Sequence, residues 1–484
     1  MLHSPARPAT VRPRGTRSGR LAALLIAVLV LTSGCGAVAE DGPSTYAANL
    51  REDRPVVDLS FDLAPSLDRV AGRERVVFTP DLPVCELVFR AWPNKPTMAD
   101  GGTELRVDGA AVDGRPAVPW ILPAGAPEGV AGTLVELPLA ECAPPGRPIT
   151  ADLVFTLTLG EDVNDRVGFS HSSEMAWWAT GFPLLAWVRG EGWAREDAVS
   201  IPGETATSED FRLRDLTVTA PAGLEVLGTG TRTGTSPGPV PGTTTHRFRA
   251  EAVRNAAVTV GRLDVVEREV SGVRVHLGTP LSGTEVPPQE WLGRVEQYID
   301  RLSEFVGPFP YPELWISVIP AQSSGLEFPS ALQFGDLGLG ELDGLVAHEL
   351  AHQWFYGLVG NNQARDPWLD ESFSTLAQAV ATERENDYVL ADIPAGHRGD
   401  IGRSMNSWGY GYTFDRYLHV VYDQGAAVLL EARRRAGEDR FDDALRAYVT
   451  ENAHRVAAPE DVATAFEDLP EVRALLIENG ALPS

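Results

Sequence analysis

Residues 348–352 read His348-Glu349-Leu350-Ala351-His352, and Glu371 follows after eighteen intervening residues. On a helix, positions i and i+4 lie on one face, so the two imidazoles can reach the same metal ion. Glu349 lies roughly 100° further around the helix than the first histidine, beside such an ion rather than on it. From there its carboxylate can accept a proton from a water molecule. The stretch therefore predicts a helix that carries a metal site with its own proton acceptor.

A third ligand has to come from another part of the chain and leave the fourth position of a tetrahedral zinc ion open, as in catalytic sites. Glu371 suits this role because it follows Asp366-Pro367, a typical helix cap and first-turn pair. We predict one Zn²⁺ bound by His348, His352 and Glu371. The alternative is a pair of packing histidines, but buried imidazoles in this apolar helix would be costly without partners.

The composition is typical of an exported hydrolase. The 484 residues allow two or three domains, and a hydrophobic content of 43% is enough to form proper cores. The net charge of −26 argues against a nucleic-acid partner and favours a soluble, self-repelling surface.

Residues 1–35 are predicted to be a targeting leader. Several arginines precede an apolar run from Leu21 to Leu31, which is too short to span a bilayer comfortably. The run leads into Thr32-Ser33-Gly34-Cys35, which resembles a bacterial lipoprotein signal, with Thr32 at the usual leucine position. We expect Cys35 to be lipidated and to anchor the protein at the outer face of the cell membrane through several acyl chains. Ordinary cleavage and secretion is the alternative.

The two remaining cysteines, Cys85 and Cys142, each lie next to strand-like sequence. In an oxidising compartment such a pair is expected to form a disulfide. Two buried free thiols are the alternative.

The chain changes texture near residue 266. After a linker (36–46), residues 47–266 show short alternating or apolar runs separated by Gly, Pro and Asp turns, which predict a β-rich, sandwich-like domain. Apolar residues then recur at helical spacing, first from 287 to 305. Residues 267–484 are therefore predicted to form a mainly α-helical catalytic domain with a small sheet.

With these motifs in place, the chain resembles the aminopeptidase N family of gluzincin zinc metallopeptidases, which includes leukotriene hydrolase. Two further segments carry the resemblance: 323–328 is similar to the family's G-x-M-E-N strand, and 421–426 to its V-Y-E-K-G-A segment. The resemblance covers most of the mature chain and implies a thermolysin-like catalytic domain after the β-rich one. Only 62 residues follow Tyr422. We therefore expect the large helical domain that usually covers the site to be absent, and the site to be more open.

The resemblance also implies roles for single residues. Glu327 would bind the free α-amine of a peptide, and backbone groups beside it at Gly325 would hold the peptide chain. Tyr422 would donate a hydrogen bond to the oxyanion of the tetrahedral intermediate. Ser324, Leu326 and Phe328 depart from the strand motif, as do Asp423 and Gln424 from the second, and Asp370 replaces the Asn of W-L-N-E-G.

The expected function is that of an exported zinc aminopeptidase. Zinc would activate the attacking water, Glu349 would act as general base, and Tyr422 would stabilise the oxyanion. The expected partners are peptides with a free amino terminus, with no nucleic acid, and the oligomeric state is left open. Two alternatives remain: a zinc endopeptidase of the same clan, and a surface-anchored binding protein without activity.

Overall fold

The structure is a computed structural model that describes residues 46–202, 207–390, 393–408 and 414–483. The predicted leader and Cys35 lie outside these ranges. Within them, no helix is both long enough and apolar enough to cross a membrane.

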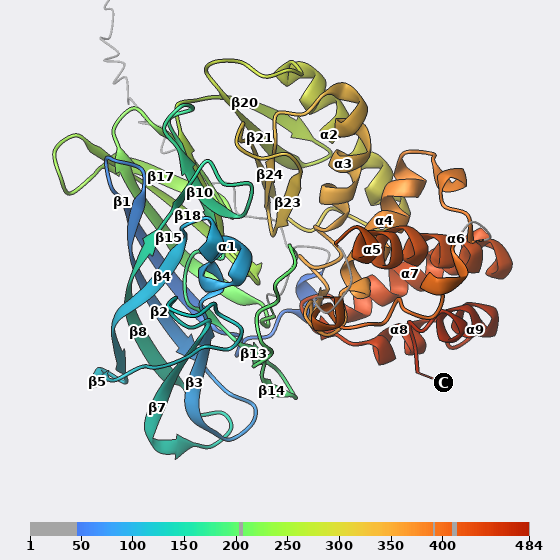
Figure 1. The fold of residues 1–484 in the computed structure, drawn as a ribbon, viewed down its shortest axis with the longest axis horizontal. Coiled ribbons are helices and arrows are strands. Elements are labelled where there is room, and N and C mark those ends of the chain that lie inside the picture. Colours follow the sequence, from blue (N-terminus) through green and yellow to red (C-terminus); the bar gives the residue numbers. More distant parts are fainter. Residues whose placement is uncertain (1–45, 203–206, 391–392, 409–413, 484) are drawn as a thin grey trace, which may run out of the picture. The chain divides into compact units, whose positions relative to one another are not determined.

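The amino-terminal half consists of strands (Figure 1). Its largest sheet has the order β17-β18-β15-β1-β2-β8-β4-β5, and all neighbours pair antiparallel except β1 and β15. The bounds are β1 (Val56–Leu63), β2 (Arg69–Phe78), β4 (Glu104–Val112), β5 (Arg115–Ala117), β8 (Ile149–Thr158), β15 (Phe211–Pro221), β17 (Thr231–Pro237) and β18 (Thr243–Val253). Strand β2 shows why these segments form strands: its exposed side chains, mostly arginines, alternate with buried ones that are apolar except for Glu74.

This half also contains a two-stranded sheet of β13 (Trp187–Val188) and β14 (Gly192–Trp193), and two sheets of intermediate size. One has the order β16-β19-β11-β10-β9 and the other the order β12-β3-β7-β6. Their bounds are β3 (Val84–Arg90), β6 (Trp120–Leu122), β7 (Leu134–Ala143), β9 (Gly160–Glu161), β10 (Val167–Ser170), β11 (Met175–Ala179), β12 (Leu184–Leu185), β16 (Glu225–Gly228) and β19 (Ala257–Gly261). The disulfide expected between Cys85 and Cys142 is present and joins β3 to β7.

A further sheet, of order β20-β21-β22-β24-β23, lies in sequence just before the helices. Its bounds are β20 (Leu263–Val270), β21 (Val273–Pro280), β22 (Glu313–Val318), β23 (Gly325–Phe328) and β24 (Ala331–Phe334). Val266, at the predicted change of texture, lies inside β20. Strand β23 is the last strand of this sheet, so one of its sides pairs with no other strand there.

The rest of the chain is mainly helical, so the predicted order of a strand-rich half followed by a helical half is confirmed (Figure 1). The helix expected for 287–305 is α2 (Pro288–Phe305), which buries Trp291, Val295 and Ile299. The others are α3 (Leu339–Ala351), α4 (Trp368–Ala381), α5 (Phe414–Tyr417), η7 (Leu418–Gln424), α6 (Gly425–Ala436), α7 (Glu438–Asn452), α8 (Pro459–Ala465) and α9 (Pro470–Glu478). Helix α3 contacts α2, α4 and β23, and this packing builds the site.

Candidate metal centre

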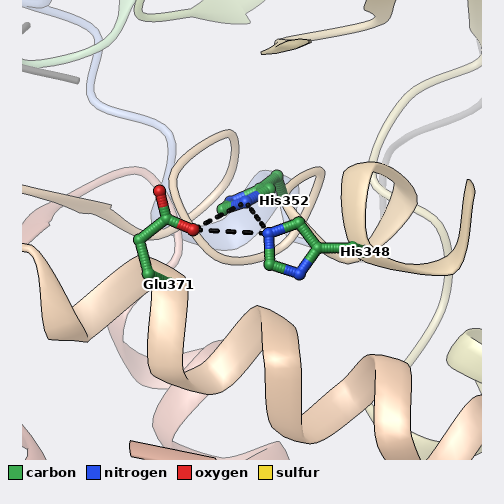
Figure 2. A group of neighbouring side chains, drawn as sticks. All are labelled: His348, His352 and Glu371. Carbon is green, nitrogen blue, oxygen red and sulfur yellow. Dashed lines mark hydrogen bonds and ion pairs between the residues drawn. The ribbon is translucent and has the colours of Figure 1, made fainter. Parts of the chain in front are cut away.

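Three buried ligand atoms meet where α3 ends and α4 begins (Figure 2). The two Nε2 atoms of His348 and His352 are 3.1 Å apart. Oε2 of Glu371 lies 3.3 Å from the first and 3.4 Å from the second. Ligand atoms that bind one tetrahedral zinc at about 2.0–2.1 Å are about 3.3–3.4 Å from each other. The three side chains therefore fit a zinc ion, with one position left for water or substrate.

The other ring nitrogens of the two histidines are held in place. Nδ1 of His348 lies 3.1 Å from Oε1 of Gln378, so the ring can donate to this amide oxygen. Nδ1 of His352 lies 3.2 Å from the Phe355 carbonyl and 3.1 Å from Oγ of Ser374. Such contacts leave Nε2 as the free nitrogen of each ring and turn it toward the metal position.

Sequence reasoning missed Gln378 and Ser374. The only signal for them is their spacing of seven and three residues after Glu371, which places them on the same face of α4.

The electrostatics of the site favour a cation at the point where the ligand atoms meet. Burial lowers the pKa of His352, but the carboxylates of Glu371 and Glu327 raise it by more, to about 10. For Glu371, burial raises the pKa, but His352 and His348 lower it by more, so the net pKa lies below its usual range. The raised pKa of His352 reports the negative charge of the carboxylates around it, which a divalent metal ion would compensate.

Glu349 lies beside the ligands and packs against a position that has no side chain. A Cβ atom at Gly325 would be only 2.5 Å from Cγ and Oε1 of Glu349. Burial, followed by the nearby Glu327 carboxylate, raises the pKa of Glu349 well above its usual range. Gly325 and Glu327 both belong to β23, so this strand supplies the space for Glu349 and a second carboxylate next to it.

The carboxylates of Glu327 and Glu349 form a small acidic cluster. One ligand atom each from Glu327, Glu349 and His352 lie within 4.8 Å of one another, and all three residues are buried. On the side of Glu327, Arg166 approaches from the segment before β10, with Nη2 3.9 Å from Oε1. Arg166 is a third residue that sequence reasoning missed.

Tyr422 lies on η7, a π-helical segment, and its ring stacks on the His348 ring with centroids 5.6 Å apart. Burial and the carboxylate of Glu371 raise the pKa of the Tyr422 hydroxyl well above its usual range, so the hydroxyl stays protonated and can donate a hydrogen bond. Tyr417, whose ring lies 5.8 Å from that of Tyr422, is fully buried, whereas Tyr422 is only partly buried.

Asp370 replaces the expected Asn but is not turned toward the ligands. Its Oδ2 accepts a hydrogen bond of 2.8 Å from Gln363, and its Oδ1 accepts one of 2.9 Å from the backbone N–H of Glu371. Burial, and then the charge of Glu371, raise the pKa of Asp370 to about 8.

Comparison with known proteins agrees with this geometry. The family model described as "Peptidase family M1 domain" matches residues 340–478, which contain the three ligands, Glu349 and Tyr422. Aminopeptidase M1-B of Oryza sativa subsp. japonica is 26% identical over 247 residues, which is 44% of this chain and 27% of that protein. Tricorn protease-interacting factor F2 of Thermoplasma acidophilum is 23% identical over 191 residues, 34% of this chain and 24% of that protein. The chain thus covers only about a quarter of the length of these relatives.

Among solved structures, the fold is similar to that of an M1 zinc metallopeptidase from Deinococcus radiodurans, with a TM-score of 0.65. The match has 19% sequence identity and covers 89% of this chain and 95% of the other. At this identity the likeness shows the shared fold alone.

Proposed function

Because the chain contains a peptidase family M1 domain and has the fold of M1 zinc metallopeptidases, we propose that it is a zinc-dependent aminopeptidase. It would remove amino-terminal residues from peptides. The observation that carries this proposal is the pair of buried carboxylates, Glu327 and Glu349, within 4.8 Å of a zinc-ligand atom. A zinc hydrolase needs only one of them for proton transfer, which leaves the other to bind a positive charge on the substrate.

The roles of the side chains follow from their positions. A zinc ion bound by His348, His352 and Glu371 would lower the pKa of water and polarise the scissile carbonyl. Glu349 accepts a proton from the attacking water and passes it to the leaving amine. The Tyr422 hydroxyl donates a hydrogen bond to the oxygen on which negative charge develops.

Glu327 would determine where the peptide is cut. Its carboxylate pairs with the α-ammonium group of the substrate, which places the first peptide bond beside Glu349. Peptide substrates fit a strand such as β23, whose outer side can pair with an extended chain. An M1 metallopeptidase of the same fold from Deinococcus radiodurans has been solved with a Tyr-Ser-Ala substrate.

Amine recognition is tested by Glu327→Gln, assayed on leucine p-nitroanilide and on its N-acetylated form. We expect the wild type to prefer the free amine, and the variant to lose about 100-fold of this preference because a charge-assisted contact is removed. If the wild-type protein cleaves internal bonds of blocked peptides as well as it cleaves free-amine substrates, the proposed aminopeptidase activity is contradicted and an endopeptidase is supported.

We further propose that the protein is exported and anchored through a lipid on Cys35. The support is the sequence of residues 1–35 and the disulfide between Cys85 and Cys142, a bond that is typical of oxidising compartments. Mass spectrometry of the native protein without reductant should find an acylated amino-terminal Cys35 and a linked Cys85–Cys142 peptide. An unmodified amino terminus at another residue would reject the anchor, and two alkylatable thiols would reject the disulfide.

A further inference from the structure

A short segment of the strand-rich half, residues 164–166 between β9 and β10, lies next to the site. Asn164 and Ser323 form two hydrogen bonds. The side-chain Nδ2 of Asn164 donates to the Ser323 hydroxyl (2.9 Å), and the backbone N–H of Ser323 donates to the side-chain Oδ1 of Asn164 (3.0 Å). Gln322 donates a third, of 3.3 Å, to the Asp165 backbone carbonyl. The segment is therefore bound to the residues that lead directly into β23.

The side chain of Arg166 extends from this segment to the acidic cluster of Glu327 and Glu349. Its Nη2 lies 3.9 Å from Oε1 of Glu327, and the two side chains are only 7% and 6% exposed. The guanidinium carbon lies 5.9 Å from the centre of the Phe328 ring. The Arg166 backbone is held on both sides: its N–H donates to Asp165, and its carbonyl accepts from the N–H of Ala179. These two hydrogen bonds fix the backbone from which the guanidinium extends.

Arg166 can compensate the negative charge of the acidic cluster. Glu327 and Glu349 are both buried and close enough for their carboxylates to repel each other. A bound substrate would supply a compensating ammonium group, but only while it is bound. Arg166 supplies a permanent positive charge beside Glu327, 3.9 Å from Oε1.

We propose that Arg166 is a positioning residue for amine recognition, which rests on the aminopeptidase function proposed above. The guanidinium attracts Oε1 of Glu327 away from Glu349 and leaves the other carboxylate oxygen for the α-ammonium group of the substrate. Arg166 acts through Glu327 and takes no part in the proton transfers. Its loss should therefore weaken the selection of free-amine substrates over blocked ones.

A double-mutant cycle tests this proposal. The selectivity is the ratio of kcat/KM for leucine p-nitroanilide to that for its N-acetylated form, measured in wild type, Arg166→Ala, Glu327→Gln and the double variant. We expect Arg166→Ala to lower the ratio about tenfold or more, mainly through KM. In the Glu327→Gln background the same change should have less than about a twofold effect, because the two residues act as one unit.

Two further variants separate charge from structure. Arg166→Lys keeps the positive charge and should recover part of the selectivity, whereas Arg166→Gln should not. Asn164→Ala removes the hydrogen bonds to Ser323 but keeps the guanidinium, and should leave the ratio within about twofold of wild type. If Arg166→Ala fails to fold, the comparison of Lys with Gln at this position decides the same question.

The outcomes distinguish this inference from the proposed function. If the wild type prefers free amines, Glu327→Gln abolishes the preference and the Arg166 variants retain it, then only the role of Arg166 is rejected. Equal losses in Asn164→Ala and Arg166→Ala, or effects that add in the double variant, would also overturn it. A wild type without any preference for free amines rejects the proposed function, and this inference with it.

Discussion

Glu349 can lie beside the metal ligands because residue 325 is a glycine. With the Glu349 side chain 2.5 Å from where a Cβ would stand, any other residue at 325 would displace either β23 or the carboxylate. The glycine is required here for space, not for its backbone angles. The same close approach brings Glu327 near Glu349, so one small residue makes room for both carboxylates.

Replacing Glu349 with glutamine should abolish turnover while leaving the zinc bound. The amide has a similar shape but cannot accept a proton, so we expect a loss of several orders of magnitude in kcat. Metal analysis should find one zinc per chain in this variant, and none in His352→Ala, which loses a ligand. Glu341→Gln, an exposed change on the same helix, is the control and should behave as wild type. Normal turnover in Glu349→Gln would remove this residue from the mechanism.

At the scale of elements, the π-helical segment η7 determines the placement of Tyr422. Single π turns inside helices occur frequently at functional sites, because the wider turn changes which side chains share a face. Ser372 of α4 contacts both η7 and the start of α6: it donates a 2.6 Å hydrogen bond to the Val421 carbonyl, and Gly425, the first residue of α6, packs against it. A Cβ at Gly425 would be 2.0 Å from the Ser372 oxygen, so the two helices can be this close only at a glycine.

Tyr422→Phe and Tyr417→Phe should separate the two neighbouring tyrosines. We expect Tyr422→Phe to lower kcat about 100- to 1000-fold with nearly unchanged substrate affinity, the typical effect of losing one oxyanion donor. Tyr417→Phe should change kcat little, because the Tyr417 hydroxyl is buried and has no hydrogen-bond partner among the described residues. Steady-state kinetics on leucine p-nitroanilide measures both. The opposite result would assign the oxyanion contact to Tyr417.

At the scale of the whole molecule, buried charges tie the strand-rich half to the catalytic half. The guanidinium of Arg254, which follows β18, donates to the backbone carbonyls of Ser208, Gly357, Leu358 and Arg455. Gly357 and Leu358 follow the end of α3 after five residues. The end of that helix is therefore held from the strand-rich half, as β23 is held through Asn164.

A buried ionisable side chain, Glu74, should make the free energy of unfolding depend on pH. Glu74 points into the core from β2, and neither carboxylate oxygen has a hydrogen-bond partner among the described residues. Burial raises its pKa well above the reference value of 4.5. A raised folded-state pKa means that this group's contribution to stability is complete below pH 4.5 and is lost as the pH rises through the folded pKa.

Glu74→Gln should remove this loss. We expect its stability relative to wild type to increase between pH 5 and pH 8, by about 1.4 kcal/mol for each pH unit over which the folded state stays protonated. Denaturant unfolding at the two pH values measures the difference. Glu225→Gln, an exposed change on β16, should show no such trend. An equal effect of Glu74→Gln at pH 5 and pH 8 would contradict the prediction.

The order of strand-rich and helical halves could be predicted from the sequence because alternation and helical spacing are local properties of the chain. The same holds for the zinc ligands. The helix repeat alone places His348 and His352 on one face, and Glu371 was recognised by its distance along the chain. The pairing of Cys85 with Cys142 needed no geometry, because they are the only cysteines after Cys35.

Only the tertiary structure revealed Arg166 beside Glu327, Gln378 and Ser374 behind the ligands, and the fit of Glu349 against Gly325. Arg166 and Glu327 are 161 positions apart, and Arg166 precedes β10 whereas Glu327 lies in β23 of another sheet, so no local pattern links them. Gln378 and Ser374 look like ordinary polar residues of a helix until α3 packs against α4. Ligand spacing follows from the geometry of one helix, whereas the charges around the ligands depend on which distant segments the packing of the core brings into contact.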